Sequence, residues 1–322
     1  MSGAAGAQDC VLAVDVGGTT MKGALVDAEA TVRERRSFDT PVADGTEAVV
    51  NRIGYAFEQL ATLAPGHGLN PPSAAGLVVP GVVDEANGVG VIASNVPFAD
   101  TPLAAPIGER LGIPVRVGHD VRAGGLAESV LGAAAGSANV LFLPLGTGIA
   151  AACIVDGRVL AADGFAGEIG HVVIDPDGES CNCGNRGCLE RVASASAVAR
   201  RYTAASGQQV DGAERVAELV RAADPVAVGV WDETVDALVR ALRMALTLLG
   251  SEVVIVGGGL GEAGDLLLDP LRERLAKALT FQRKPELRQA VLGDQAGCLG
   301  AALLALGVGV ESSDGSRQAS AP

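Results

Sequence analysis

The 322-residue sequence lacks an uncharged apolar run of the ~18 residues that a membrane-spanning helix needs. Its longest uncharged stretches, 140–155 and 296–310, are interrupted by proline or glycine, and we expect both to be buried in a core. The first residues also lack the basic group and the apolar run of a secretory signal. We therefore expect no membrane association and a cytoplasmic location.

Basic residues are scarce relative to acidic ones. The chain has 24 Lys and Arg against 38 Asp and Glu, which gives a formal net charge of -14. Such a surface repels a phosphate backbone, so we expect no nucleic-acid partner. Hydrophobic residues make up 48% of the chain, which excludes disorder as its main state and allows one large or two medium domains. Only the polar end, 311–322, is expected to be disordered.

Cysteine is sparse as well, and six in a chain of this length do not indicate a disulfide framework. Cys181, Cys183 and Cys188 nevertheless fall within one short loop, and His171 lies ten positions before the first of them. Three thiolates and one imidazole complete a tetrahedral zinc set without a position for water, so the zinc would be structural. Incidental cysteines in a loop are the alternative, and the ligand count favours zinc. The other cysteines lie in apolar segments, and we expect them in the core: Cys10, Cys153 and Cys298.

One pattern occurs twice in the sequence. Residues 14–30 and 143–159 each contain an apolar strand, a Gly/Thr turn, a second apolar strand and an acidic turn, which predicts two similar lobes. Hydrophobic periodicity then predicts strands at 11–14, 23–26, 31–38, 75–79, 115–117, 140–145, 149–155 and 252–256. It predicts helices at 46–63, 103–111, 123–131, 195–205, 213–223, 225–249 and 264–279, with a structured loop over 164–190.

The two Gly/Thr turns are candidate phosphate sites, because glycine lets backbone N–H groups approach phosphate oxygens without a side chain in the way. The first turn holds Gly17, Gly18, Thr19 and Thr20, and the second holds Gly146, Thr147 and Gly148. Either turn alone is more typical of a plain hairpin. Together with the later run Gly257, Gly258 and Gly259, they favour phosphate binding. Asp15, beside the first turn, could hold Mg²⁺ through water.

Three acidic residues have ambiguous roles when each is taken alone. Asp120 follows a short apolar strand where a helix begins, so the residue types fit helix capping and catalysis equally well. Glu168 and Glu190 flank the cysteine loop. All three would come together if that loop folds against the strand ends of the second lobe.

An ordered set of motifs spans nearly the whole chain. The set is Asp15-x-Gly-Gly-Thr, Asn95-x-Pro97, a motif centred on Asp120, Gly146-Thr-Gly, Gly167-Glu-Ile-Gly-His171, Cys181-x-Cys-Gly-x-x-Gly-Cys-x-Glu and Val256-Gly-Gly-Gly. It resembles the ROK family of sugar kinases and repressors and, within it, the zinc-containing glucokinases. The resemblance implies an actin-like (ribonuclease H-like) α/β fold of two lobes, with nucleotide and sugar in the cleft. We expect the lobes at 1–118 and 119–295, a zinc loop at 171–190, and a C-terminal helix at 296–310 that returns to the first lobe.

The resemblance also implies roles for individual residues. Asp120 looks like the general base that accepts the O6 proton of a sugar as it attacks the γ-phosphate of ATP. Asp15 and the turns with Thr19 and Thr147 would handle Mg²⁺ and the phosphates, and 257–259 would lie near the adenosine. The sugar hydroxyls would bind Asn95, Glu168, His171 and Glu190. His171 could serve zinc through one ring nitrogen and the sugar through the other, and the family also suggests a homodimer.

His119 departs from the family pattern, which has Asn before the catalytic Asp to contact the sugar. A neutral imidazole accepts a hydrogen bond at only one nitrogen, so His119 bears on which sugar is bound. From the resemblance we expect an ATP-dependent hexose 6-kinase for D-glucose or a close analogue. The alternative is an amino-sugar kinase for kanosamine, N-acetylmannosamine or N-acetylglucosamine. The family's repressors carry a DNA-binding domain ahead of the first motif, and fourteen residues precede Asp15 here. A non-catalytic sugar sensor is the second alternative, and ATP is favoured over polyphosphate as donor.

Overall fold

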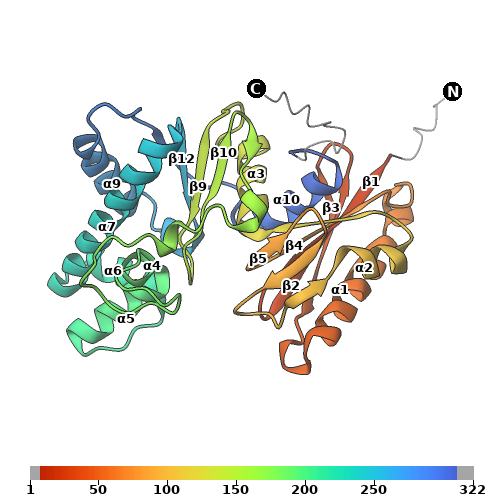
Figure 1. The fold of residues 1–322 in the computed structure, drawn as a ribbon, viewed down its shortest axis with the longest axis horizontal. Coiled ribbons are helices and arrows are strands. Elements are labelled where there is room, and N and C mark those ends of the chain that lie inside the picture. The colour runs from red at the N-terminus through yellow and green to blue at the C-terminus, as the bar shows by residue number, and fades with distance from the viewer. Residues whose placement is uncertain (1–7, 310–322) are drawn as a thin grey trace, which may run out of the picture.

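Two five-stranded sheets form the framework of the computed structural model, which describes residues 8–309 (Figure 1). The first sheet comprises, in spatial order, β3 (Val32–Asp39), β2 (Thr20–Asp27), β1 (Cys10–Val16), β4 (Ala75–Val79) and β8 (Val115–His119). The second comprises β11 (Arg158–Val159), β10 (Ala152–Val155), β9 (Val140–Pro144), β12 (Val253–Gly257) and β13 (Glu286–Gln289). In each sheet three antiparallel strands come first, and two further strands join parallel to the first of them. The repeated sequence pattern therefore corresponds to a repeated topology.

Helices cover both faces of the first sheet. They are α1 (Thr46–Ala61), α2 (Ala104–Leu111) and α10 (Ala296–Ala305). Successive side chains of β1 point to opposite faces: Leu12 and Val14 pack with Phe57 of α1, whereas Ala13 packs with Ala301 of α10. The strand is therefore buried on both sides, as its unbroken apolar run predicts.

The second sheet has a thick helical layer on one face. Its helices are α4 (Glu190–Ala193), α5 (Ala195–Ser206), α6 (Gly212–Arg221), α7 (Pro225–Leu249), α8 (Gly258–Gly261) and α9 (Asp265–Ala278). Leu141 and Leu143 of β9 enter the core that these helices form, together with Trp231 of α7. Phe142 faces the other side, where α3 (Asp120–Val130) packs against the sheet through Val121.

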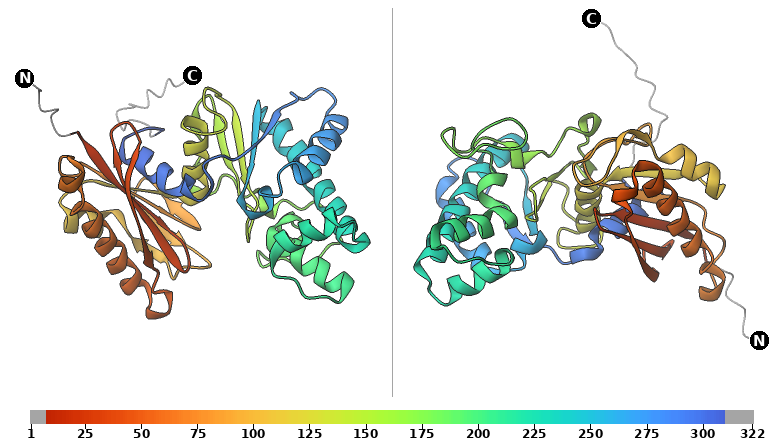
Figure 2. Two further views of the ribbon diagram at one scale, coloured as in Figure 1. Left: turned by 180° about the vertical axis from the view of Figure 1, so that it is seen from behind. Right: turned by 90° about the horizontal axis from the view of Figure 1, so that it is seen from below.

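Helices α3 and α10 cross between the two sheets (Figures 1 and 2). Glycine permits the close approach. A Cβ at Gly300 of α10 would lie 2.2 Å from the carbonyl oxygen of Ala123 in α3. On the other side of α10, a Cβ at Gly76 of β4 would lie 1.8 Å from the carbonyl oxygen of Ala301. Helix α10 thus fastens the first sheet to α3, which itself lies on the second sheet.

A small antiparallel sheet was not predicted. It consists of β5 (Val82–Asp84), β6 (Val89–Ile92) and β7 (Ala99–Pro102). Short 3-10 helices complete the described part: η1 (Val42–Asp44), η2 (Ala64–His67), η3 (Ala162–Gly164), η4 (Ile169–His171) and η5 (Gly293–Gln295). Between residues 8 and 309, no helix is both long and apolar enough to cross a lipid bilayer.

The structure corrects several predicted bounds. The strand predicted at 149–155 begins only at Ala152, because the Ile149 N–H donates to Glu190 and the Ala151 N–H donates to the Gly167 carbonyl instead of pairing with a strand. The strand predicted at 115–117 runs on to His119. The expected disordered tail, 311–322, lies outside the described residues.

Candidate active site

A pocket of about 380 Å³ opens where the two sheets and the two crossing helices meet. Asp15 enters it from the end of β1 and Asp120 from the first residue of α3. Gly257, Gly258 and Gly259 enter it from the end of β12 and the start of α8. Two carboxylates thus face a glycine-lined wall that has no side chains.

The sheet register explains why the two carboxylates meet. Strands β1, β4 and β8 are parallel, and Asp15 pairs with Val78, which pairs in turn with Gly118. Asp120 comes two residues after Gly118, so both carboxylates lie at the carboxyl edge of the sheet. Ligands of open α/β sheets bind at this edge.

Burial raises the pKa of both carboxyl groups. The side chain of Asp120 keeps 35% of its surface exposed. Burial of the rest, with the nearby Asp15 carboxylate as the next cause, raises its pKa to about 7. Burial also raises the pKa of Asp15 to about 6, and the positive charge of Lys22 opposes that rise. A carboxyl group that changes protonation near neutral pH is suited to accept a proton during a reaction.

His119, and not Asp120, caps helix α3. The imidazole Nδ1 of His119 accepts a hydrogen bond from the Arg122 backbone N–H at 3.3 Å, whereas Asp120 Oδ1 accepts from the adjacent Val121 N–H at 2.7 Å. The capping interpretation of Asp120 is therefore wrong, and its second carboxylate oxygen stays available to a ligand. Burial lowers the pKa of His119 to about 3, with the Arg122 charge as a second cause. The ring is neutral at physiological pH and carries its proton on Nε2.

Both predicted Gly/Thr turns form, but neither belongs to the pocket lining in the described part of the chain. In the first, the Gly17 N–H donates to the Thr20 carbonyl at 3.0 Å. Thr19 and Thr20 are exposed. Gly18 lies against Asn95, because a Cβ there would be 3.0 Å from the Asn95 carbonyl oxygen. The structure therefore places Asn95 beside the first turn.

The second turn is held by Glu190. The Gly146 N–H donates to the Gly148 carbonyl at 3.2 Å, and Glu190 Oε2 accepts from the Ile149 N–H at 2.8 Å. Thr147 is exposed at the tip of the turn. Because Pro144 pairs with Gly257 across β9 and β12, this turn and the 257–259 run leave the second sheet at the same edge.

His171, Cys181, Cys183 and Cys188 form the predicted cluster, with their ligand atoms all within 4.8 Å of one another. The Cys183 and Cys188 sulfurs are 3.6 Å apart, and Cys181 Sγ is 3.7 Å from His171 Nδ1. Four donors about 2.3 Å from a tetrahedral zinc ion would lie about 3.8 Å apart, so the arrangement fits that ion. The other ring nitrogen, His171 Nε2, lies 4.0 Å from Glu168 Oε2. Each ring nitrogen of His171 therefore has its own partner, Cys181 at Nδ1 and Glu168 at Nε2.

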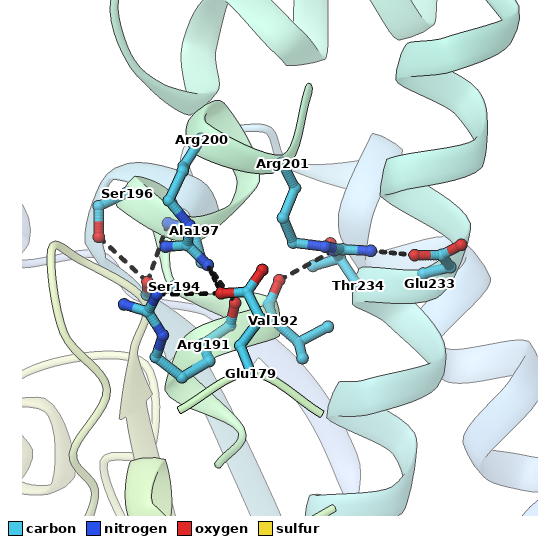
Figure 3. Close-up of polar contacts among 10 residues, drawn as sticks. All are labelled: Glu179, Arg191, Val192, Ser194, Ser196, Ala197, Arg200, Arg201, Glu233 and Thr234. Carbon is cyan, nitrogen blue, oxygen red and sulfur yellow. Dashed lines mark hydrogen bonds and ion pairs between the residues drawn. The ribbon is translucent and has the colours of Figure 1, made fainter. Parts of the chain in front are cut away.

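A polar network fastens the cysteine loop to the helices that follow it (Figure 3). Glu179 Oε2 accepts hydrogen bonds from Arg191 at 2.9 Å and from Arg200 at 2.8 Å. Arg201 of α5 donates to the Val192 carbonyl at 3.1 Å and pairs with Glu233 of α7. The network fixes α4, whose first residue is Glu190, between the cysteine loop and α5.

The helix that follows α4 also supports the second glycine turn. Ser194 caps α5 by accepting from the Ala197 N–H at 3.1 Å. Ser196 then donates its hydroxyl to the Thr147 carbonyl at 2.6 Å. The Thr147 carbonyl at the tip of this turn is thus hydrogen-bonded to the protein.

Sequence reasoning missed several residues of the site. Lys22 and Asp294 line the pocket and form an ion pair at 3.2 Å. Glu128 also lines it, and this fully buried carboxylate accepts from the N–H groups of Val291 and Leu292 at 2.9 and 2.8 Å. The sequence signal for Glu128 is that it is the one charged residue of the predicted helix 123–131.

Comparison with known proteins shows what the chain is similar to. Residues 11–308 match the ROK family. The glucokinase of Thermotoga maritima is 34% identical over 91% of this chain and 96% of its own length. A ROK family glucokinase from Streptomyces griseus, solved with glucose and AMPPNP, is 30% identical with a TM-score of 0.77 over 92% of this chain and 99% of that one. A ROK family transcriptional regulator, a homologue of the E. coli MLC protein, is 27% identical with a TM-score of 0.84 over 94% of this chain and 79% of its own. These structures confirm the predicted actin-like α/β fold.

Proposed function

The chain belongs to the ROK family, and from that premise we propose that it is an ATP-dependent hexose 6-kinase that phosphorylates D-glucose. One observation carries the proposal most directly. Asp120, with a pKa near neutrality, shares a pocket with Asp15 and the side-chain-free wall at 257–259. Phosphoryl transfer asks mainly for positioning and charge neutralisation, and such a pocket supplies both.

Asp120 is the proposed general base. Its carboxylate accepts the O6 proton of the sugar while O6 forms a bond to the γ-phosphorus of ATP. The bond from that phosphorus to the β–γ bridging oxygen breaks, and ADP leaves. The wall at 257–259 lets the adenosine and its phosphates approach the backbone, and the turns at 17–20 and 146–148 offer further N–H groups to the phosphates.

Asp15 is the proposed magnesium residue. Its carboxylate is the kind of oxygen ligand that Mg²⁺ prefers, and it faces the pocket from β1. When bound, Mg²⁺ would neutralise charge on the phosphates of ATP. Lys22, paired with Asp294 at the same pocket, adds a positive charge close to this carboxylate.

The proposed sugar site lies on the other side of Asp120. We assign to it Asn95, His119, Glu168, His171 and Glu190. Its support is spatial: Glu168 is close enough to raise the pKa of Asp120 as a minor cause, and His171 Nε2 faces Glu168. The cluster of His171 with the three cysteines would hold a structural zinc ion, which fixes the imidazole for this second task.

An amino-sugar kinase is the alternative, and His119 favours it. Because Nδ1 of the ring is occupied by the cap of α3, only the Nε2–H donor remains for a ligand. Asn offers an acceptor as well as a donor. A sugar with a different pattern of acceptors would suit the imidazole. A non-catalytic sugar sensor is the second alternative, since a ROK regulator has a similar fold.

Three further expectations stay proposals. These are that the chain is cytoplasmic, that it forms a homodimer, and that its two lobes span 1–118 and 119–295. Size-exclusion chromatography with light scattering measures the oligomeric state. Limited proteolysis tests the lobes.

Sugar-dependent ADP release tests the proposed function. The purified protein is assayed with ATP and Mg²⁺ against D-glucose, kanosamine, N-acetylmannosamine, N-acetylglucosamine and no sugar. A preference for glucose by kcat/KM, with glucose 6-phosphate as product, supports the proposal. Preference for an amino sugar moves the assignment to the alternative, and no turnover with any sugar favours the sensor.

A further inference from the structure

Arg122 connects three separate parts of the molecule. This side chain is only 3% exposed, on the first turn of α3. Its Nε donates to Glu85 Oε1 at 2.9 Å. Its Nη1 donates to the carbonyls of Gly164 at 3.2 Å and Ala166 at 3.5 Å. One guanidinium thus links α3, the turn between β5 and β6, and the loop that leads to Glu168.

Glu85 connects the same parts from the other side. The oxygen that accepts from Arg122 also accepts from the backbone N–H of His119 at 3.2 Å. The small sheet touches the 162–166 loop directly, because a Cβ at Gly164 would lie 2.6 Å from the Val83 carbonyl oxygen. Glu85 and Arg122 therefore hold the β8–α3 junction and this loop against one turn.

The loop that Arg122 holds is strained. Ala162 and Asp163 have φ values of 46° and 53°, in the left-handed region that non-glycine residues avoid. Such a conformation persists only where its surroundings impose it, and it occurs preferentially at functional sites. The two carbonyls bound by Arg122 lie just after this strained pair, so the guanidinium is placed to impose it.

Stability alone does not explain this arrangement. Burying the Arg122 charge costs free energy that an ion pair often does not repay, because that side chain is only 3% exposed while Glu85 stays 31% exposed. In addition, the Arg122 Nη2 atom is buried without a hydrogen-bond partner among residues 8–309, which costs further free energy. The pair instead fixes the position of the β8–α3 junction relative to the 162–166 loop.

We propose that Glu85 and Arg122 are a positioning pair that sets the sugar side of the cleft, by fixing the His119 backbone and the loop to Glu168 relative to Asp120. This inference rests on the proposed function. The pair contacts neither the 257–259 wall nor Asp15 in any recorded hydrogen bond or ion pair of the described residues. Its loss should therefore affect the sugar much more than the nucleotide.

Steady-state kinetics of Glu85→Ala and Glu85→Gln test the proposal. Alanine leaves the His119 N–H and the Arg122 Nε without their acceptor, and we expect KM for the sugar to rise on the order of 10-fold, the effect of an unpaired buried donor. KM for ATP should change by less than about 2-fold. Glutamine keeps an acceptor oxygen and should restore part of the loss. Glu58→Gln is the matched control, because Glu58 forms an exposed ion pair with Arg110 at 2.7 Å, on α1 and α2.

Hydrogen exchange gives a readout that does not depend on turnover. Backbone amides of 162–171 should exchange faster in Glu85→Ala than in the unmodified protein, and at an unchanged rate in Glu58→Gln. Equal rises in both KM values, or unchanged exchange in this loop, would overturn the positioning role. If the unmodified protein phosphorylates no sugar, the proposed function fails while the exchange result still decides on the pair. If Glu85→Ala does not fold, the same kinetic and exchange measurements are made on Glu85→Gln, in which smaller changes of the same kind are expected.

Discussion

Asp15 and Asp120 lie at the same edge of one sheet and line one pocket, although 104 residues separate them in sequence. After burial, the Asp15 carboxylate is the next cause that raises the pKa of Asp120 to about 7. Two carboxyl groups that would both be ionised in water therefore have raised pKa values here. Asp120 is the one proposed to accept a proton, and a pKa near neutrality suits that task.

The pH dependence of the reaction follows from that pKa. Asp120 must be ionised to accept the O6 proton, and it loses its own proton as pH rises through about 7. We expect kcat/KM for glucose to rise roughly tenfold per pH unit just below this value, more steeply below about 6 where Asp15 is protonated as well, and to level off above about 7. The measurement is a pH–rate profile with Mg²⁺ in excess. The pH–rate profile of His119→Asn should rise over the same pH range, because His119, with its pKa lowered to about 3, is already neutral throughout that range. A flat profile from pH 5.5 to 8 would contradict the assignment.

Replacing His119 tests the basis of sugar preference. Asn is a good helix cap, so His119→Asn should leave the melting temperature of the protein nearly unchanged. The amide oxygen has two lone pairs, so it can cap α3 and also accept a hydrogen bond from the sugar, while the amide NH₂ donates. We expect KM for glucose to fall about 2- to 10-fold, the contribution of one added hydrogen bond. KM values for glucose and N-acetylmannosamine measure the preference, and an unchanged ratio would exclude His119 as a specificity residue.

Metal content should follow the four-residue cluster. Elemental analysis is expected to find one zinc ion per chain. Cys183 is exposed, so Cys183→Ser removes a ligand without opening a cavity, and we expect the zinc content to drop sharply. Cys153→Ser is the control, because Cys153 is a buried thiol outside the cluster. Full zinc retention in Cys183→Ser would refute the ligand set.

The crossing of α3 and α10 makes a prediction about stability. Gly300→Ala places a Cβ 2.2 Å from the Ala123 carbonyl oxygen, and such overpacking should destabilise the protein by about 1–3 kcal/mol. Gly229 of α7 has no atom within 4 Å of its would-be Cβ, so Gly229→Ala should stabilise by up to about 1 kcal/mol. Urea denaturation measures both. Equal effects would mean that the crossing is not tightly packed.

The sequence predicts the framework because its signals there are strong. The buried strands β1 and β9 begin with unbroken apolar runs, at 10–14 and 140–143, and lead into glycine turns. The predicted bounds of α7, residues 225–249, are the observed ones. The metal cluster is likewise local, since its three cysteines lie in one loop. The small sheet was missed because its strands have three or four residues, too few to show a period.

The parts of the site that depend on tertiary contacts could not be predicted. Nothing next to Glu85 in sequence shows that it accepts from both His119 and Arg122. The sequence did not identify the cap of α3 because Asp is a better cap than His by propensity, whereas in the structure His119 precedes the helix and Asp120 is its first residue. The partnership of Glu190 with the second turn likewise joins segments 41 residues apart.

Removal of the Asp120 carboxylate tests the central claim most directly. ADP formation with glucose and ATP is compared between the unmodified protein, Asp120→Asn and Asp211→Asn. Asp211 is an exposed residue before α6 whose side chain makes no capping hydrogen bond. We predict that kcat/KM of Asp120→Asn falls on the order of 10²- to 10⁴-fold, the contribution of a general base, with zinc content and melting temperature retained, while Asp211→Asn stays fully active. Full activity of Asp120→Asn would contradict the account.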